Sequence, residues 1–107
     1  MTRLFEFIEL APFARARDAY GMDDVEFAQL QTTLLGHPDA GEVIPATDGC
    51  RKLRWRAPGR GKRGGYRVIY FLRNAQDQIV LVLLYAKNVR ETIEPGLLRE
   101  LKKACRS

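Results

Sequence analysis

The residues of this sequence that could do chemistry are mostly cationic, and they are concentrated in its second half. Residues 51–67, "RKLRWRAPGRGKRGGYR", contain eight lysines and arginines and no acidic residue. Residues 1–50 carry a formal charge of −6 and residues 51–107 carry +11, which together give the net charge of +5. A block of one sign creates a strong positive field, so we expect a polyanion such as RNA, DNA or an acidic protein segment as its partner.

The sequence offers none of the common catalytic groupings of nucleophiles or metal ligands. It has no Ser-His-Asp or Cys-His arrangement, and no cluster of His, Cys, Asp and Glu at metal-ligand spacing. The single histidine, His37, stands between Gly36 and Pro38, as is typical of a surface or capping residue. We therefore expect no metal and no cofactor, and any catalysis must use lysine, arginine and tyrosine.

These residue types suit the cleavage of RNA without a metal ion. The 2′-hydroxyl must lose a proton, the charge of the phosphorane must be stabilised, and the leaving 5′-oxygen must be protonated. Arginine can stabilise the phosphorane with paired donors, and a lysine crowded by other cations can act as an acid or base. The candidates lie on, or at the ends of, strands that should pair with one another: Lys52, Arg54, Arg67, Tyr85 and Lys87.

The segment "GRGKRGG", residues 59–65, contains the spacing G-x-G-x-x-G of a dinucleotide-binding loop. Such a loop must open a helix, whereas "YRVIYF" with its β-branched and aromatic residues predicts a strand, so we reject nucleotide binding. The glycines instead favour a tight hairpin. We expect its basic residues to contact RNA phosphates, with a charged tip that only prevents sheet pairing as the alternative: Arg60, Lys62 and Arg63.

The pattern along the chain predicts a single α+β domain, residues 1–107, of the usual domain size. We expect a strand at 2–10, helices at 12–20 and from Asp23 to Gly36, and a short strand at Glu42–Ile44. Three strands, "CRKLRWRA", "YRVIYFL" and "IVLVLLYAK", should form an antiparallel meander. Pro95 begins a last helix, in which Leu97, Leu101 and Cys105 recur at helical spacing.

Alternation in the first strand of the meander places two kinds of side chain on opposite faces. Leu53 and Trp55 should face a core, whereas Lys52, Arg54 and Arg56 should share the other face. The face of Arg67 is undetermined, because its strand is apolar on both faces. Arg67 and Lys87 could therefore also be residues that only flank core strands.

The amino terminus and the cysteines bear on localisation. The first 20 residues contain no apolar stretch long enough for a signal peptide or a membrane span. The two cysteines, Cys50 and Cys105, lie far apart and match no metal spacing, so we expect free thiols in a reducing compartment. These features predict a cytoplasmic protein that does not associate with a membrane.

Together, "RKLRWRAPGRGKRGGYRVIYF", "LLYAKN" and the C-terminal helix resemble the HigB-like toxins of the RelE/ParE superfamily. The resemblance implies a small antiparallel-rich sheet with two N-terminal helices and one C-terminal helix. It also implies a type II toxin–antitoxin module, whose toxin is an endonuclease that cuts mRNA in the decoding site of the ribosome. A helix-turn-helix, HigA-like antitoxin neutralises such a toxin, and operator DNA is bound only through the antitoxin.

The resemblance also suggests roles for individual residues. Arg67 matches the family arginine that contacts the scissile phosphate. Lys52 and Arg54 match the alternating basic residues of the preceding strand, and Lys87 matches the basic residue that ends the last strand. RelE-type members have a tyrosine in the C-terminal segment, whereas this tail has none. Tyr85 could take its place, and the general acid and base stay unassigned.

Two other functions are compatible with the same sequence. The first is a ParE-like toxin that inhibits DNA gyrase by binding and cleaves nothing, and the second is an inactive relative that only pairs with its antitoxin. The dense row of basic side chains favours the endoribonuclease, because a gyrase-binding protein does not need phosphate contacts.

Overall fold

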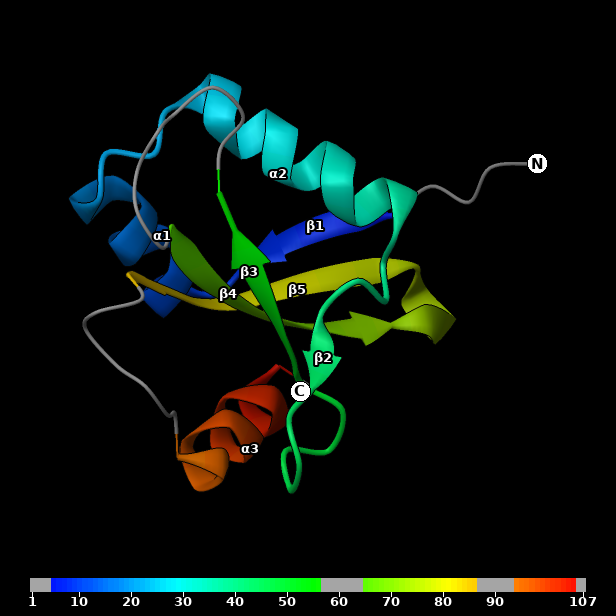
Figure 1. The fold of residues 1–107 in the computed structure, drawn as a ribbon. Helices are drawn as coiled ribbons and strands as arrows, with labels where there is room; N and C mark the ends of the chain where they lie inside the picture. The colour runs from blue at the N-terminus through cyan, green and yellow to red at the C-terminus, as the bar shows by residue number, and fades with distance from the viewer. Residues whose placement is uncertain (1–4, 57–64, 87–93, 106–107) are drawn as a thin grey trace.

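The described residues form one five-stranded mixed sheet with helices on both of its faces (Figure 1). The structure is a computed structural model, and it describes residues 5–56, 65–86 and 94–105. The elements in chain order are β1 (Glu6–Glu9), α1 (Ala11–Ala19), α2 (Asp24–Gly36), β2 (Glu42–Val43), β3 (Arg51–Trp55), β4 (Tyr66–Arg73), β5 (Gln78–Ala86) and α3 (Pro95–Ala104). The α+β class and the placement of helices predicted from the sequence are confirmed.

The strands lie in the order β1-β5-β4-β3-β2. β3, β4 and β5 form the predicted antiparallel meander, and β1 adds to β5 in parallel. A 3₁₀ turn at Asn74–Gln76 connects β4 to β5. The register between β4 and β5 shifts after Ile69, because Val82 is skipped in the pairing and forms a bulge.

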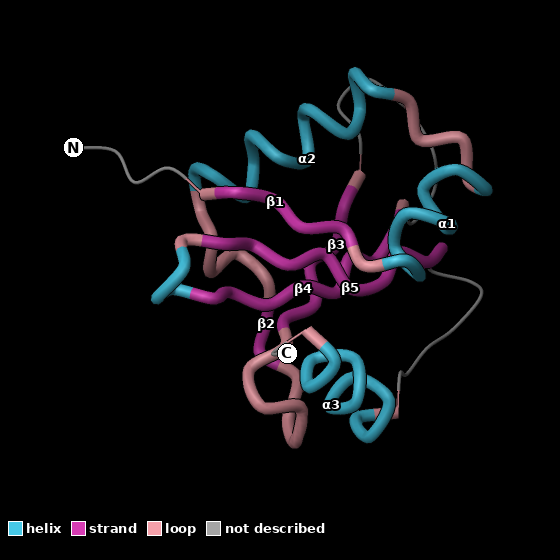
Figure 2. Tube along the Cα trace, turned by 180° about the vertical axis from the view of Figure 1, so that it is seen from behind, coloured by secondary structure: helices cyan, strands magenta, loops and turns pink. Residues whose placement is uncertain are grey.

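Both faces of the sheet are buried, which explains why β4 and β5 are apolar throughout (Figure 2). Helices α1 and α2 cover one face through Phe13, Leu30 and Leu34. Helix α3 covers the other face, where Leu98 packs against a second core that includes Ile69. The meander therefore has an α1/α2 side and an α3 side.

The start of α2 is capped by Asp23, the residue from which the helix was predicted. The Asp23 carboxylate accepts a hydrogen bond from the Glu26 amide at 2.8 Å, as expected of a helix N-cap. The Glu26 carboxylate accepts a hydrogen bond from the indole N–H of Trp55 at 3.3 Å and ties the end of β3 to α2.

The predicted bounds need three corrections. β1 is shorter than the predicted 2–10, α1 begins at Ala11, before Pro12, and β2 stops at Val43, not at Ile44. In α3, Leu97, the first of the three residues at the predicted helical spacing, is 43% exposed, and its neighbour Leu98 is fully buried. The other two, Leu101 and Cys105, are partly buried and pack with Leu98 against the α3-side core.

Helix α3 is attached to the connection between β2 and β3. Arg99 and Lys102 donate hydrogen bonds to the backbone carbonyls of Ala46 and Asp48. The connection has a fixed shape, since the buried Thr47 hydroxyl donates to the Ile44 carbonyl at 2.6 Å. These contacts fix α3 against the connection that precedes β3.

Candidate nucleic-acid interface

Three predicted site residues lie in one row across the meander. Arg54 of β3 is the register partner of Arg67 of β4, and Arg67 is in turn the register partner of Tyr85 of β5. Cross-strand partners in a sheet share a face and are neighbours. We call Arg54, Arg67 and Tyr85 the central row.

The central row lies on the α3 side of the sheet. Arg67 is two residues before Ile69, whose side chain belongs to the α3-side core, and side chains two apart in a strand share a face. Tyr85 belongs to the same core, and Arg54 alternates with Leu53 and Trp55, which pack on the α1/α2 side. The register thus shows which face of the sheet Arg67 occupies, which the apolar pattern of its own strand could not show.

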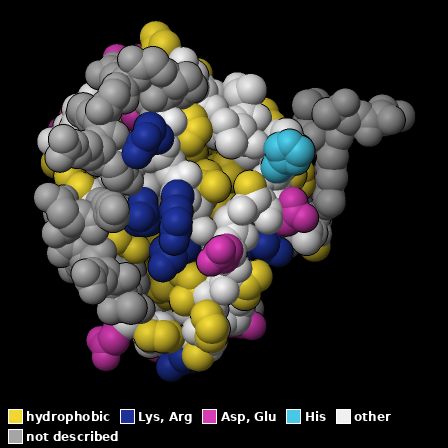
Figure 3. All heavy atoms as spheres, viewed as in Figure 1, with side chains coloured by type: hydrophobic (Ala, Val, Ile, Leu, Met, Phe, Trp, Pro, Cys, Tyr) yellow, Lys and Arg dark blue, Asp and Glu magenta, His cyan; other side chains and the backbone are white. Residues whose placement is uncertain are grey.

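Lys52 extends the basic surface from the central row. It is half-buried and lies on the face of Arg54, as predicted, and its register partner in β2 is Glu42. Arg56 is exposed just after the end of β3. In Figure 3, Lys and Arg side chains gather over β3, between α2 and α3. Four predicted residues lie outside the described residues: Arg60, Lys62, Arg63 and Lys87.

The exposure of the central row changes across the sheet. Arg54 is exposed and Arg67 is half-buried, with a weak hydrogen bond of 3.4 Å from its Nη1 to the Tyr66 carbonyl. Tyr85 is only 6% exposed. The row therefore passes from solvent at β3 into the α3-side core at β5, so that an anion would meet the two guanidinium groups first.

The two arginines of the row occupy directly opposite positions on adjacent strands. Their guanidinium groups therefore lie on neighbouring positions of one face. Guanidinium groups bind phosphate with paired, charge-assisted donors, so an anion at this point could be bound by both. The row is therefore suited to hold a phosphate group.

Gly65 is a further residue that the site requires. It precedes β4 with φ of +56°, and a Cβ atom there would lie 2.2 Å from the Trp55 carbonyl oxygen. Only glycine can bring the two strands this close, and Arg67 is two residues away. Gly65 is the last residue of the segment 59–65, whose glycines were predicted to favour a tight hairpin.

Other groups that could form a site lie elsewhere. Within the described ranges no three or more His, Cys, Asp and Glu side chains gather in a way that could hold a metal. His37 is the exposed C-cap of α2, which confirms the predicted surface or capping role. Among the helices described, none is long and apolar enough to cross a membrane.

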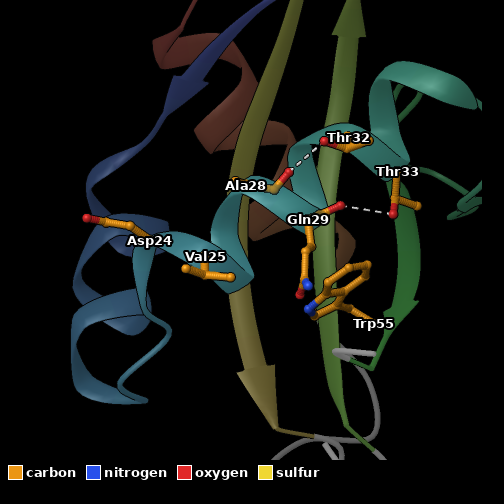
Figure 4. A pocket seen from close by; sticks show the side chains of 7 residues that line it. All are labelled: Asp24, Val25, Ala28, Gln29, Thr32, Thr33 and Trp55. Carbon is orange, nitrogen blue, oxygen red and sulfur yellow. Dashed lines mark hydrogen bonds between the residues drawn. The ribbon is translucent and has the colours of Figure 1, made fainter. Parts of the chain in front are cut away.

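A shallow groove of about 630 Å³ lies on the other side of the sheet (Figure 4). Its walls are the outer surface of α2, including Val25, Ala28 and Thr32, and the ring of Trp55. Among the described residues, those that line it include Asp24 and no lysine or arginine. The groove is therefore apolar with an acidic edge, and it is not part of the basic surface.

Two comparisons with known proteins agree with this architecture. The model of a family described as the RelE toxin of the RelE/RelB toxin–antitoxin system matches residues 42–107, more than half of the chain. The matched region contains the whole central row. The chain therefore belongs to the RelE toxin family, and it is the toxin component of a toxin–antitoxin system, with an antitoxin as its partner.

A solved structure supports the fold independently. The chain is similar to a double arginine-to-alanine mutant of the E. coli toxin RelE in the free state, with 14% identity and a TM-score of 0.54. The likeness covers 81% of this chain and 87% of the other. The predicted RelE-like fold is thus confirmed.

Proposed function

We propose that this toxin is a HigB-like, ribosome-dependent mRNA endonuclease that needs no metal ion and inhibits translation. The observation that supports the proposal best is the direct cross-strand pairing of Arg54 with Arg67. Two guanidinium groups at opposite positions of adjacent strands are suited to bind a phosphodiester, and the RelE family match supports mRNA as the proposed substrate.

The proposed reaction is attack by the 2′-hydroxyl of a nucleotide on its own 3′-phosphate. The new bond joins the 2′-oxygen to phosphorus, the bond from phosphorus to the 5′-oxygen breaks, and a cyclic phosphate and a 5′-hydroxyl result. Arg67 stabilises the negative charge of the phosphorane, and Arg54 holds the phosphate from the exposed side of the row. These roles follow the order of exposure along the row.

The proton transfers fall to Lys52, Tyr85 and Lys87. Lys52 lies on the face of the two arginines, where its ammonium group can reach the sugar-phosphate backbone. Little of the Tyr85 phenol is open to RNA, so we assign it to the inner end of the site. Lys87 follows this strand end in the sequence, outside the described residues.

The partners proposed for this activity are the ribosome with mRNA in its decoding site and a helix-turn-helix, HigA-like antitoxin. Operator DNA would be bound only through the antitoxin, and the location would be the cytoplasm. The RelE family match supports the antitoxin in general terms. Neutralising Arg60, Lys62 and Arg63 together should weaken ribosome binding and lower its salt slope by about one unit per lost phosphate contact.

The deciding experiment is induction of the chain in bacteria without its antitoxin, with mapping of mRNA 5′ ends and a reporter of DNA damage. New ends within translated reading frames, absent when translation is blocked, are the expected result. DNA damage without new mRNA ends would instead favour the ParE-like gyrase inhibitor. Growth without either signal, from a chain that is expressed and folded, would identify an inactive relative.

A further inference from the structure

The far end of β5 has an edge that no strand covers among the described residues. β1 pairs with β5 only from Gln78 to Leu81, whereas β5 continues to Ala86. A backbone N–H on such an edge must find another acceptor, because an unpaired, partly buried amide is costly. Tyr85 lies within this stretch of β5, so another element than β1 must hold that edge of the strand in place.

The side chain of Tyr20 supplies the missing acceptor. The Ala86 amide donates a hydrogen bond to the Tyr20 hydroxyl at 3.1 Å. Tyr20 is the C-cap of α1, and its own amide donates to the Ala16 carbonyl at 2.9 Å, so the ring is carried by a fixed helix end. Figures 1 and 2 both show α1 beside this end of β5.

The same ring also contacts β4. The ring centroids of Tyr20 and Tyr66 lie 5.2 Å apart with an interplanar angle of 57°. Tyr66 is the register partner of Ala86, and it directly precedes Arg67. The Tyr20 side chain therefore contacts both Tyr66, which adjoins Arg67, and Ala86, which adjoins Tyr85. It makes both contacts from the α1/α2 side of the sheet.

We propose that Tyr20 is a positioning residue, which fixes the relative placement of Arg67 and Tyr85 by holding Ala86 and Tyr66 from behind. The inference rests on the proposed function, since it assigns Tyr20 a role in RNA cleavage. Tyr20 itself lies on the opposite side of the sheet from the central row and does not contact RNA. Its effect is on the rate of the chemical step, because small misplacements of catalytic groups lower rates steeply.

The test uses Tyr20→Phe, which keeps the ring contact with Tyr66 and removes the acceptor for Ala86. On programmed ribosomes, kcat for mRNA cleavage should fall about tenfold while KM stays unchanged. The matched control is Tyr70→Phe, because the Tyr70 hydroxyl donates to the Pro38 carbonyl at 2.7 Å and accepts from the Gly41 amide at 2.9 Å. Tyr70→Phe should lower stability and leave kcat unchanged.

Two outcomes would overturn the role of Tyr20. One is a wild-type kcat in Tyr20→Phe, and the other is a loss of kcat in Tyr70→Phe that matches its loss of stability, as a merely structural effect would produce. A coupled effect is expected with Tyr85→Phe, so that the double variant is less impaired than the product of the two single effects.

A readout without RNA separates this inference from the proposed function. Hydrogen exchange at the Ala86 amide should be faster in Tyr20→Phe than in wild type, and unchanged in Tyr70→Phe. If the wild type cleaves no mRNA, the proposed function fails, and faster exchange at Ala86 would still support the positioning contact. Unchanged exchange would overturn it whatever the activity.

Discussion

Arg67 on β4 and Tyr85 on β5 are direct cross-strand partners, and Arg67 has Arg54 of β3 as its partner on the other side. The three side chains come from positions 54, 67 and 85 and share one face of the sheet. An antiparallel meander makes this possible, since its register brings distant positions into a single row. The proposed phosphate site is therefore built on strands instead of loops.

The cross-strand pairing of Arg54 with Arg67 predicts that removing one charge has opposite effects on stability and on ribosome binding. Arg54→Gln should raise the free energy of unfolding by about 0.2–1 kcal/mol, because it removes a like-charge cross-strand pair. The same change should weaken ribosome binding and lower its salt slope by about one unit. Urea unfolding and binding at several salt concentrations measure the two effects.

Arg15→Gln is the control, because Arg15 is exposed on α1 and away from the central row. It should change neither the free energy of unfolding nor ribosome binding. A loss of stability in Arg54→Gln would contradict a destabilising effect of the like charge at Arg67.

The close approach at Gly65 predicts a strong response to a single methyl group. Gly65→Ala should destabilise the protein by about 2 kcal/mol or more, because of the positive φ and the overlap with the Trp55 carbonyl. Gly36→Ala is the control, as no heavy atom lies within 4 Å of a Cβ there. Equal thermal melting temperatures for the two variants would contradict the strand contact.

The different burial of Leu97 and Leu98 in α3 predicts opposite results for these neighbouring leucines. Leu98→Ala should cost about 2–5 kcal/mol, since it leaves a cavity in the α3-side core. Leu97→Ala should change stability by less than about 0.5 kcal/mol, since this side chain is largely exposed. Denaturant unfolding of the two variants measures the difference. A larger loss of stability in Leu97→Ala than in Leu98→Ala would contradict the burial of Leu98 in the α3-side core.

The buried Cys50 predicts a loss of stability at alkaline pH. Burial raises the pKa of its thiol above the ordinary value of 9.0, an effect that Lys102 and the Thr47 hydrogen bond partly oppose and Asp48 reinforces. The folded state then keeps a proton that the unfolded chain loses, so the contribution of Cys50 is complete below about pH 9 and declines above it.

The measurement is unfolding by urea at about pH 8 and about pH 10. Wild type should lose more stability across this interval than Cys50→Ala, and Cys105→Ala, which retains Cys50, should behave as wild type. An identical pH response in Cys50→Ala would remove Cys50 as the cause.

The sequence was sufficient to predict the elements of this fold, because hydrophobic alternation, glycine stops and the Asp23 cap are local signals. It could not place Arg67, since a strand buried on both faces carries no alternation and the register depends on a bulge at Val82. The role of Tyr20 was also hidden, because its partner is a backbone amide 66 residues away. The helical spacing of Leu97, Leu101 and Cys105 did not identify Leu98 as the buried leucine, because two adjacent leucines fit the helical period equally well.

The most direct test of the proposed activity is single-turnover cleavage of mRNA on purified, programmed ribosomes by wild type and Arg67→Ala. The predicted result is a cleavage rate lower by about 10²-fold or more in Arg67→Ala, the scale for losing one donor to the transition state. Arg15→Ala should cleave at the wild-type rate. A folded Arg67→Ala protein that cleaves mRNA as fast as wild type would contradict the assignment of the central row as the catalytic site.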